Sequence, residues 1–328
     1  MGAVSEHAVI VTAREQAEMV AAKRPGEPLG PQQVEGHTLT TLVSSGTELA
    51  SGYLADSFPR GIGYAAVFEF EAVGAEVTDV AVGDVMFCMG GHRSFQRVSR
   101  EAAVAVPDGL SAEAAVFARM MGISMSTLTT TSARPPSIVL VTGLGLVGNL
   151  AAQVFARCGY QVVAVDPLES RRQLANGVGL GTVLEAVPLD DERLVGQVDL
   201  AVDCSGHEQA VLDACRMVRK RGEVVLLGVP WRRHTDLTAH DVFDAIFFKY
   251  AVVRSGWEWE VPQQPMDFRK NSMFSQFAAA LRWLAEGRVR VDGLAASVLP
   301  KDAQMVFQAL LHRRCEGLSF VFDWTMLA

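Results

Sequence analysis

Three glycines and one acid near the middle of the chain have the spacing of a dinucleotide-binding site. Gly143, Gly145 and Gly148 follow the apolar run 138–141 and form the pattern G-x-G-x-x-G. In that pattern the first glycine makes a tight turn, the second lets a pyrophosphate approach the backbone, and the third lets helix and strand pack closely. Asp166 follows Gly148 by 18 residues, where a carboxylate can accept hydrogen bonds from ribose hydroxyls. The pattern predicts dinucleotide binding; the competing interpretation is a glycine-rich turn in another α/β protein.

The elements around this motif predict a parallel sheet. The run 138–141 is apolar and β-branched, which is typical of a buried strand, and residues 149–158 have helical periodicity that ends at Gly159. A second buried strand, 161–165, ends at Asp166. Strands and helices then continue to alternate, with helices expected at 169–176, 208–220 and 239–248 and strands at 198–203, 223–228 and 251–254. This alternation predicts an α/β fold with a doubly wound parallel sheet and right-handed crossovers.

The flanking regions have a different pattern. Before residue 111 the chain shows short strands separated by Gly and Asp turns, which favours an antiparallel, barrel-like β domain. The strands expected there are 7–12, 37–44, 64–73 and 85–89. Ser111 is a suitable N-cap for a helix at 112–127. Beyond Gly256 we expect two helices and a final strand, at 272–286, 301–313 and 318–323.

Composition excludes several classes of function. The 328 residues are 49% hydrophobic and 20% charged, with a formal net charge of −8, so nothing draws the chain to nucleic acid or to an anionic membrane. The five cysteines are scattered without a C-x-x-C pair, which fits a reducing compartment. The start of the chain lacks a basic segment followed by a long apolar run, and no stretch is typical of a membrane span. We therefore expect a cytoplasmic location.

Several further stretches carry a resemblance to a known family. They are Ser45-Gly46-Thr47-Glu48, Phe58-Pro59 with Gly63-Tyr64, Gly74 with Val82-Gly83-Asp84-Val85, Asp203-Cys204-Ser205-Gly206, and the segment from Gly222 to Gly228. With the glycine motif they make the chain resemble the medium-chain dehydrogenase/reductase superfamily over nearly its whole length. The resemblance implies a Rossmann domain, 123–259, inserted in a β-rich GroES-like catalytic domain formed by 1–122 and 260–328.

The resemblance also implies a nicotinamide cofactor. NAD is expected over NADP because Asp166 would repel a 2′-phosphate, although Arg171 or Arg172 could reach that phosphate. Further cofactor-binding positions follow from the family pattern: Leu146, Val147, Arg171, Ser205, Gly228 and Val229. The last strand of the sheet, 251–254, would be an exposed edge, and in the family that edge pairs across a two-fold axis, so a homodimer or a dimer of dimers is expected.

The chain departs from the zinc-containing members of that superfamily. Ser45 stands at the position of a cysteine ligand, and the family's G-H-E is Gly63-Tyr64-Ala65 here. Hydroxyl groups are poor substitutes for thiolate, imidazole or carboxylate ligands of zinc. The four-cysteine structural lobe is also missing, since residues 84–106 contain only Cys88. The sequence thus resembles the zinc-free branch, and no metal is expected.

Without a metal, other groups must stabilise the substrate oxygen and move its proton. The candidates are Tyr64, Ser45 and Thr47 at the former metal site and His92 on the turn after the strand 85–89. Each also has a structural interpretation: Tyr64 as a half-buried strand aromatic, Ser45 and Thr47 as turn residues, and His92 as a solvated turn residue. The segment 257–260, Trp-Glu-Trp-Glu, would either line the substrate cleft or pack at a domain junction.

Three functions are compatible with these features. The leading hypothesis is a zinc-independent oxidoreductase that moves hydride between NAD(H) and a carbonyl/alcohol carbon of a small molecule such as a polyol, sugar or cyclitol. An enoyl or quinone reductase is the second, in which hydride goes to the β-carbon of a conjugated carbonyl. The third is a non-catalytic cofactor-binding protein.

Overall fold

The structure is a computed structural model that describes residues 6–327 of the chain. The first five residues lie outside the described part, so the prediction that the chain starts without a secretory signal rests partly on residues that are not described. The chain divides into two compact units. The first unit contains the residues up to 119, residues 277–286 and the residues from 293 onward, and the second unit contains 120–276 and 287–292. The proposed catalytic and Rossmann domains stay predictions, and we describe each unit by itself.

A six-stranded sheet forms the centre of the second unit. Its strands are β9 (Ile138–Thr142), β10 (Gln161–Val165), β11 (Thr182–Leu184), β12 (Val198–Asp203), β13 (Val218–Leu226) and β14 (Val252–Ser255). They lie in the order β11-β10-β9-β12-β13-β14, and every neighbouring pair is parallel. The order therefore reverses between β9 and β12, which is the point where doubly wound sheets bind ligands. The predicted fold class is confirmed.

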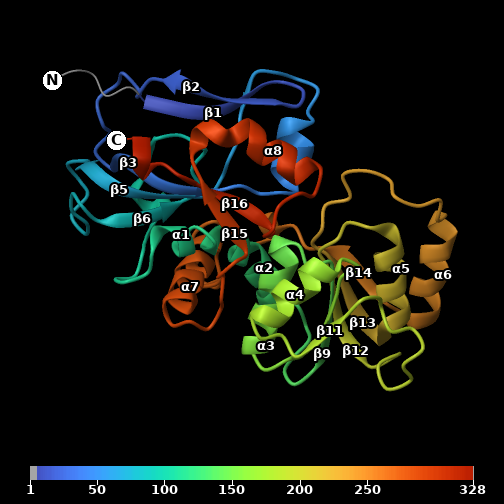
Figure 1. The fold of residues 1–328 in the computed structure, drawn as a ribbon. Helices are drawn as coiled ribbons and strands as arrows, with labels where there is room; N and C mark the ends of the chain where they lie inside the picture. Colours follow the sequence, from blue (N-terminus) through green and yellow to red (C-terminus); the bar gives the residue numbers. More distant parts are fainter. Residues whose placement is uncertain (1–5, 328) are drawn as a thin grey trace. The chain divides into compact units, whose positions relative to one another are not determined.

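Helices cover both faces of this sheet, so its central strands are buried. They are α3 (Leu146–Arg157), α4 (Glu169–Gly177), α5 (Glu208–Met217) and α6 (Ala239–Lys249), while α2 (Ala118–Thr130) begins in the first unit and continues in the second. In Figure 1, α5 and α6 lie on one side of the sheet and α3 and α4 on the other. Leu140, Ala201 and Val224 have no exposed surface. This burial on both faces explains the continuous apolar runs in the sequence.

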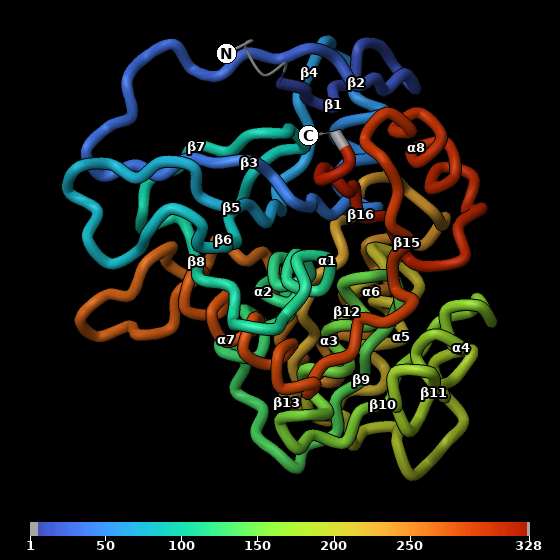
Figure 2. Tube along the Cα trace, turned by 60° about the vertical axis from the view of Figure 1, so that its left-hand side comes forward, coloured from blue at the N-terminus to red at the C-terminus, as the bar shows by residue number. Residues whose placement is uncertain are grey.

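The first unit is built from two sheets. The smaller has the order β2-β1-β4, and the larger has the order β15-β16-β3-β5-β6-β8, with β7 also paired to β3. Their strands are β1 (Glu6–Ala13), β2 (Gln16–Ala22), β3 (Gln33–Leu42), β4 (Arg60–Gly61), β5 (Ala66–Val73), β6 (Val85–Cys88), β7 (Phe95–Ser99), β8 (Ala103–Ala105), β15 (Ala295–Val298) and β16 (Ser319–Asp323). β16 pairs with β3 in antiparallel register, so strands from the two ends of the chain share one sheet. Figure 2 traces this return of the chain from blue to red.

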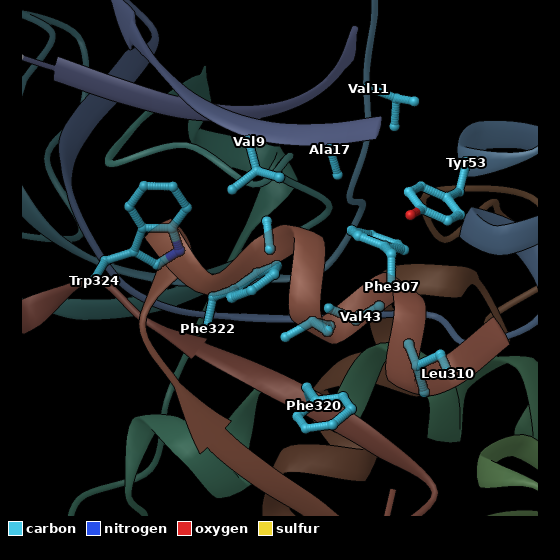
Figure 3. Close-up of a cluster of buried hydrophobic side chains, with 12 residues drawn as sticks. Val9, Val11, Ala17, Val43, Tyr53, Phe307, Leu310, Phe320, Phe322 and Trp324 are labelled. Atoms are coloured by element: carbon cyan, nitrogen blue, oxygen red, sulfur yellow. The ribbon is translucent and has the colours of Figure 1, made fainter. Parts of the chain in front are cut away.

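A core of aromatic and aliphatic side chains joins these sheets through α8 (Ala303–Leu311). Figure 3 shows Phe307 of α8 near Tyr53, and their rings stack with centroids 5.1 Å apart. Phe322 and Trp324, from β16 and the residue after it, are buried in the same cluster. The remaining helices that contribute to this unit are α1 (Ala112–Ala115), part of α7 (Met273–Ala285), a π-helical turn (Glu48–Tyr53) and short 3₁₀ turns (Arg100–Ala102, Pro300–Asp302 and Thr325–Leu327).

Two predicted helices differ from the structure. The helix expected at 112–127 is interrupted after Ala115, where Phe117 N–H bonds to Ala114 O in an i→i+3 turn, although Ser111 caps it as expected. The helix expected at 208–220 ends at Met217, because Val218 is extended and pairs with Val198 as the start of β13. The structure also contains strands that the sequence analysis did not name: β2, β4, β7, β8, β11 and β15.

Candidate active site

The glycine motif connects β9 to α3 in the second unit. Gly143 has φ +83°, and a Cβ atom there would lie 2.8 Å from the backbone nitrogen of Ser205. A Cβ on Gly148 would lie 1.8 Å from the carbonyl oxygen of Gly143, so only glycine fits there. Gly145, the N-cap of α3, has nothing within 4 Å of its Cβ position. The turn thus leaves open space before a helix N-terminus, whose free N–H groups and positive dipole suit a pyrophosphate.

Asp203 ties the two central strands together beside this turn. Its Oδ1 accepts a hydrogen bond from Thr142 Oγ1 at 2.8 Å and its Oδ2 accepts one from the N–H of Gly206 at 3.0 Å. Ser205 donates to Oδ1 as well, through both Oγ and N–H. Burial is the main cause that raises the pKa of Asp203, and these hydrogen bonds oppose it. The carboxylate therefore fixes the loop after β12 against β9, where the strand order reverses.

The predicted cofactor residues after β12 and β13 also lie together. Gly228 packs against the same loop, since a Cβ there would lie 2.4 Å from the nitrogen of Gly206. The N–H of Gly228 donates to Asp203 O at 2.6 Å. Val229, which follows it, is 47% exposed. The structure thus brings the loops of Gly143, Ser205 and Gly228 to one edge of the sheet, with Leu146 and Val147 in the first turn of α3.

Asp166 lies at the end of β10 and holds the glycine turn. Its Oδ2 accepts a hydrogen bond from Leu144 N–H at 2.8 Å, and its Oδ1 accepts one from Leu168 N–H at 2.9 Å. Arg171 Nη1 lies 3.2 Å from Oδ2, whereas Arg172 donates to the backbone oxygen of Asp166. The residue is 1% exposed. Because a carboxylate has about four acceptor sites, hydrogen bonding to ribose stays compatible with these contacts.

Tyr64 is the centre of a polar cluster in the first unit. It is partly buried, and its hydroxyl is hydrogen-bonded to the side chains of Ser44 and Thr47. The guanidinium carbon of Arg119 lies 4.8 Å from the centroid of its ring. Burial is the main cause that raises the pKa of Tyr64, followed by the negative charge of Glu48. The hydrogen bonds and the charge of Arg119 oppose this rise, but the pKa stays above its usual value, so the phenol is protonated at neutral pH.

Ser45 and Thr47 lie in the turn after β3. Thr47 precedes the π-helical turn as its N-cap, and its carbonyl oxygen accepts a hydrogen bond from Ser51 Oγ at 2.8 Å. Both residues are partly buried. The hydroxyl of Tyr64 is hydrogen-bonded to Thr47 and to Ser44, the residue before Ser45.

His92 lies under this cluster with both ring nitrogens engaged. Nε2 is 2.8 Å from Glu48 Oε2 and Nδ1 is 2.7 Å from Thr41 Oγ1, which also accepts a hydrogen bond from Trp324 Nε1. The ring packs edge-on against Phe322, and the side chain has no exposed surface. Since an ionised carboxylate only accepts, we assign Nε2 as the donor to Glu48 and Nδ1 as the acceptor from the Thr41 hydroxyl. His92 is therefore buried, which excludes the structural interpretation of a solvated turn residue.

Comparison with known proteins gives a family match in the second unit. Residues 147–270 match the zinc-binding dehydrogenase family. An alcohol dehydrogenase of Geobacillus stearothermophilus is 30% identical over 148 residues, covering 43% of each chain. D-guloside 3-dehydrogenase of Escherichia coli (strain K12) is 30% identical over 184 residues, covering 51% of this chain and 52% of that protein. These matches span about half the length of the relatives and support the zinc-type alcohol dehydrogenase-like superfamily.

Solved structures extend the likeness to nearly the whole chain. Galactitol-1-phosphate dehydrogenase from Escherichia coli superposes with a TM-score of 0.82 at 18% identity, covering 97% of this chain and 99% of that one. The chain has the medium-chain dehydrogenase fold. Within residues 6–327, no helix is long and apolar enough to cross a membrane.

Medium-chain dehydrogenases that use zinc need ionisable ligands, and the corresponding positions do not supply them here. Ser45 and Tyr64 carry hydroxyl groups and Ala65 a methyl group, while the cation of Arg119 lies over the Tyr64 ring. The nearby Glu48 and His92 bond to each other. Among the described residues, no group of three or more His, Cys, Asp or Glu side chains could hold a metal ion. These donors do not fit a zinc ion, and the residues of the family match do not include positions 45, 64 or 65.

Sequence reasoning missed two groups in this chain. Asp203 was used only as part of a family motif, although an acid that ends a buried strand is a signal for a structural carboxylate. Arg119 is the second group, and it lies in the segment Phe117-Ala118-Arg119-Met120-Met121. An arginine within an otherwise apolar segment is itself a signal, since a buried cation requires nearby partners.

Proposed function

We propose that this protein is a zinc-independent, nicotinamide-dependent oxidoreductase that moves hydride between NAD(H) and a carbonyl/alcohol carbon of a polyol, sugar or cyclitol. The observation that carries the proposal is the open glycine turn at the reversal of strand order, where Gly145 has free space and the loops of Ser205 and Gly228 converge. The D-guloside and galactitol-1-phosphate dehydrogenases similar to this chain have polyol or sugar substrates in their names, which supports the substrate class.

NAD is the proposed cofactor, with NADP less favoured. Acetophenone reductase from Geotrichum candidum has the same fold and was solved with NAD, while another neighbour was solved with NADP. Asp166 is proposed to face the ribose 2′ position, and two like charges about 4 Å apart at an effective dielectric of about 20 repel by about 4 kcal/mol before screening. Arg171 offsets part of this repulsion at 3.2 Å from Asp166. Calorimetric titration with each cofactor tests the preference, and tighter binding of NADP would contradict it.

Tyr64 is the proposed proton-exchanging group, with Thr47 as relay and His92 as a positioning residue. When bound, NAD⁺ would supply the hydride acceptor for alcohol oxidation, and the chain's own residues would have to take the proton from the substrate oxygen. In carbonyl reduction Tyr64, held by Ser44 and Thr47, would give its phenol proton to the substrate oxygen and regain a proton from solvent through Thr47. Alcohol oxidation would reverse these transfers, with the alcohol proton passing to the Tyr64 oxygen as the phenol proton leaves through Thr47 to solvent. Glu48 and His92 hold the turn that carries Thr47. Ser45 is proposed to orient the substrate beside them.

Zinc independence is tested by elemental analysis and chelation. The purified protein is expected to contain no stoichiometric zinc, and a chelator such as EDTA should leave its turnover unchanged. One zinc ion per chain, with activity lost on chelation, would contradict the proposal. The expectation rests on the donor chemistry of Ser45, Tyr64 and Ala65.

We also propose that two copies of the chain associate through the edge strand β14 and helix α6. β14 is the last strand of its sheet, and the nearby apolar side chains Phe243, Phe247 and Phe248 are 64%, 74% and 68% exposed. An unpaired edge next to an apolar surface favours pairing with a second copy. Light scattering should give at least a dimer mass, and Phe247→Glu should lower that mass. A native monomer at micromolar concentration would refute the proposal.

A dehydrogenase screen separates the proposal from its alternatives. With NAD⁺ and a panel of polyols, sugars and cyclitols, NADH formation is expected for at least one compound. Oxidation of NADH by quinones or enones without any alcohol activity would instead indicate an enoyl or quinone reductase. Tight cofactor binding without turnover of either panel would indicate a non-catalytic cofactor-binding protein.

A further inference from the structure

A pocket lies at the end of the last strand of the parallel sheet. It has a volume of about 430 Å³ and is lined by residues that follow or end β14: Arg254, Ser255, Trp257, Trp259 and Glu260. This volume is in the range of about 300–1,000 Å³ that is typical of small-molecule sites. The pocket belongs entirely to the second unit.

The register of the sheet places this pocket on the same edge as the glycine turn. Ser255 pairs with Leu226, Leu226 with Asp203, and Asp203 with Thr142, the last residue of β9. In such sheets the ribose-binding acid and the glycine turn hold one half of a dinucleotide, and the second half lies beyond the reversal of strand order. Here that direction leads across β12 and β13 toward β14. The pocket therefore adjoins the side on which the reacting half of the cofactor would bind.

Two indole rings give the pocket large apolar surfaces. Trp257 is 69% exposed and Trp259 is 50% exposed, whereas Glu258 between them is only 6% exposed. A 3₁₀ turn (Glu258–Glu260) and a hydrogen bond from Trp257 N–H to Ser255 Oγ fix the backbone of this segment. A rigid exposed indole is suited to stack against the C–H face of a sugar or cyclitol ring.

The charged side chains of Arg254 and Glu260 supply the pocket with hydrogen-bonding groups for a ligand. Arg254 bonds to Glu223 Oε1 at 2.5 Å, to Thr130 Oγ1 at 3.0 Å and to Glu260 Oε2 at 3.2 Å. Glu260 is 53% exposed, so its carboxylate can accept further hydrogen bonds. One guanidinium with two carboxylates leaves a negative local charge, which disfavours phosphate or carboxylate ligands. Neutral hydroxyl groups, which both donate and accept, match this combination.

We propose that Trp257 and Trp259, with the Arg254–Glu260 pair, form a subsite that binds the remote part of a neutral polyhydroxylated ring, a sugar or a cyclitol. The inference rests on the proposed function, because it names the substrate class of that reaction. The subsite determines affinity and specificity and takes no part in proton transfer.

The test measures binding in the absence of turnover. Glucose, myo-inositol and glucose 6-phosphate are titrated into the native full-length protein, with and without NAD⁺, and saturation-transfer NMR of each probe is recorded. At least one neutral probe is expected to bind saturably and more tightly than the phosphate ester. Saturable binding of neither neutral probe, or tighter binding of the phosphate ester, would overturn the proposal.

Two variants localise the effect. Trp257→Ala should weaken binding of the neutral probe about tenfold, through loss of stacking and of buried apolar area, and leave NAD⁺ binding unchanged. Phe268→Ala removes another exposed aromatic of the same unit, outside the pocket, and should change neither. Equal effects of the two variants would overturn the subsite, even if turnover with NAD⁺ supports the proposed function. A smaller oligomer in Trp257→Ala, with probe binding intact, would instead assign this surface to an interface between copies.

Measurements of probe binding and of turnover distinguish a failure of the subsite from a failure of the proposed function. If no alcohol is oxidised but Trp257→Ala still weakens probe binding, the proposed function fails and the subsite stands. With a turned-over substrate, Trp257→Ala should raise KM about tenfold and change kcat little, since the removed contact is made before and during the reaction alike. A loss confined to kcat would contradict the subsite.

Discussion

The edge of the parallel sheet and the cluster around Tyr64 achieve their geometry in different ways. At the sheet edge, the shape depends on backbone: Gly143 and Gly148 allow close approaches that any side chain would block. Around Tyr64, the shape depends on side chains from separate segments, among them Thr41, Glu48 and Arg119. The first arrangement is local in sequence and the second is not.

This difference has a physical consequence. A backbone site tolerates changes of neighbouring side chains but not the addition of a Cβ atom at its closest contacts. A buried polar network has the opposite sensitivity, because removing one partner leaves another donor or acceptor unsatisfied. Substitutions in the two regions should therefore give different signatures: lost ligand binding at the sheet edge and lost stability around His92.

The largest effect is expected from Gly145→Val. The valine fits the backbone, whose φ is −62°, and occupies the open space of the turn. Loss of two hydrogen bonds to a charged pyrophosphate, each worth about 1.5–3 kcal/mol, should weaken NAD⁺ binding at least about 100-fold. Isothermal titration calorimetry measures the change.

Gly26→Val is the matched control, because Gly26 also has nothing within 4 Å of its Cβ position but lies far from the motif in sequence. It should leave both NAD⁺ binding and the unfolding temperature unchanged. If Gly145→Val binds NAD⁺ as the native protein does, the glycine turn is not the pyrophosphate site.

The sheet edge could be predicted from sequence because each signal is short. The apolar run, the glycine spacing and Asp166 lie within one strand–helix–strand unit, and their roles follow from backbone geometry. The multiple contacts of Asp166 to Leu144 and Leu168 could not be predicted, since they depend on the path of two turns.

The environment of His92 was beyond sequence reasoning. Its partners Thr41 and Glu48 precede it by 51 and 44 residues, and Trp324, which bonds to Thr41, comes from the end of the chain. A histidine in a Gly-Gly-His-Arg turn is typical of an exposed position, and only the pairing of β16 with β3 buries it. The contact between Arg119 and Tyr64 could not be predicted for the same reason, because the two residues are far apart in sequence.

Glu48→Gln tests the network with a smaller effect. Glu48 accepts from Ser44 N–H through one oxygen and from His92 through the other, and glutamine offers only one acceptor oxygen. One buried donor is then unsatisfied, which should cost about 1–3 kcal/mol of stability. Chemical unfolding of the first unit should shift accordingly, while the exposed Glu316→Gln should shift it little. Equal stability of both variants would contradict the network.

The smallest effect concerns the charge of Arg119. Its cation lowers the pKa of Tyr64, so Arg119→Met should raise that pKa further above the usual tyrosine value of about 10, and Arg119→Lys should raise it less. Ultraviolet difference titration against Tyr64→Phe isolates the signal of this phenol. A lower or unchanged pKa in Arg119→Met would show that Arg119 does not act on Tyr64.

The central claim, that Tyr64 exchanges the proton without zinc, has one direct measurement. Single-turnover formation of NADH is recorded for the metal-free native protein and for Tyr64→Phe, with the best substrate of the screen and saturating NAD⁺. Loss of one donor to the developing oxyanion costs about 2.7–4 kcal/mol, so the rate should fall about 100-fold or more while NAD⁺ binding is unchanged. If Tyr64→Phe keeps more than about a third of the native rate, the loss is far smaller than expected and Tyr64 is not the proton-exchanging group.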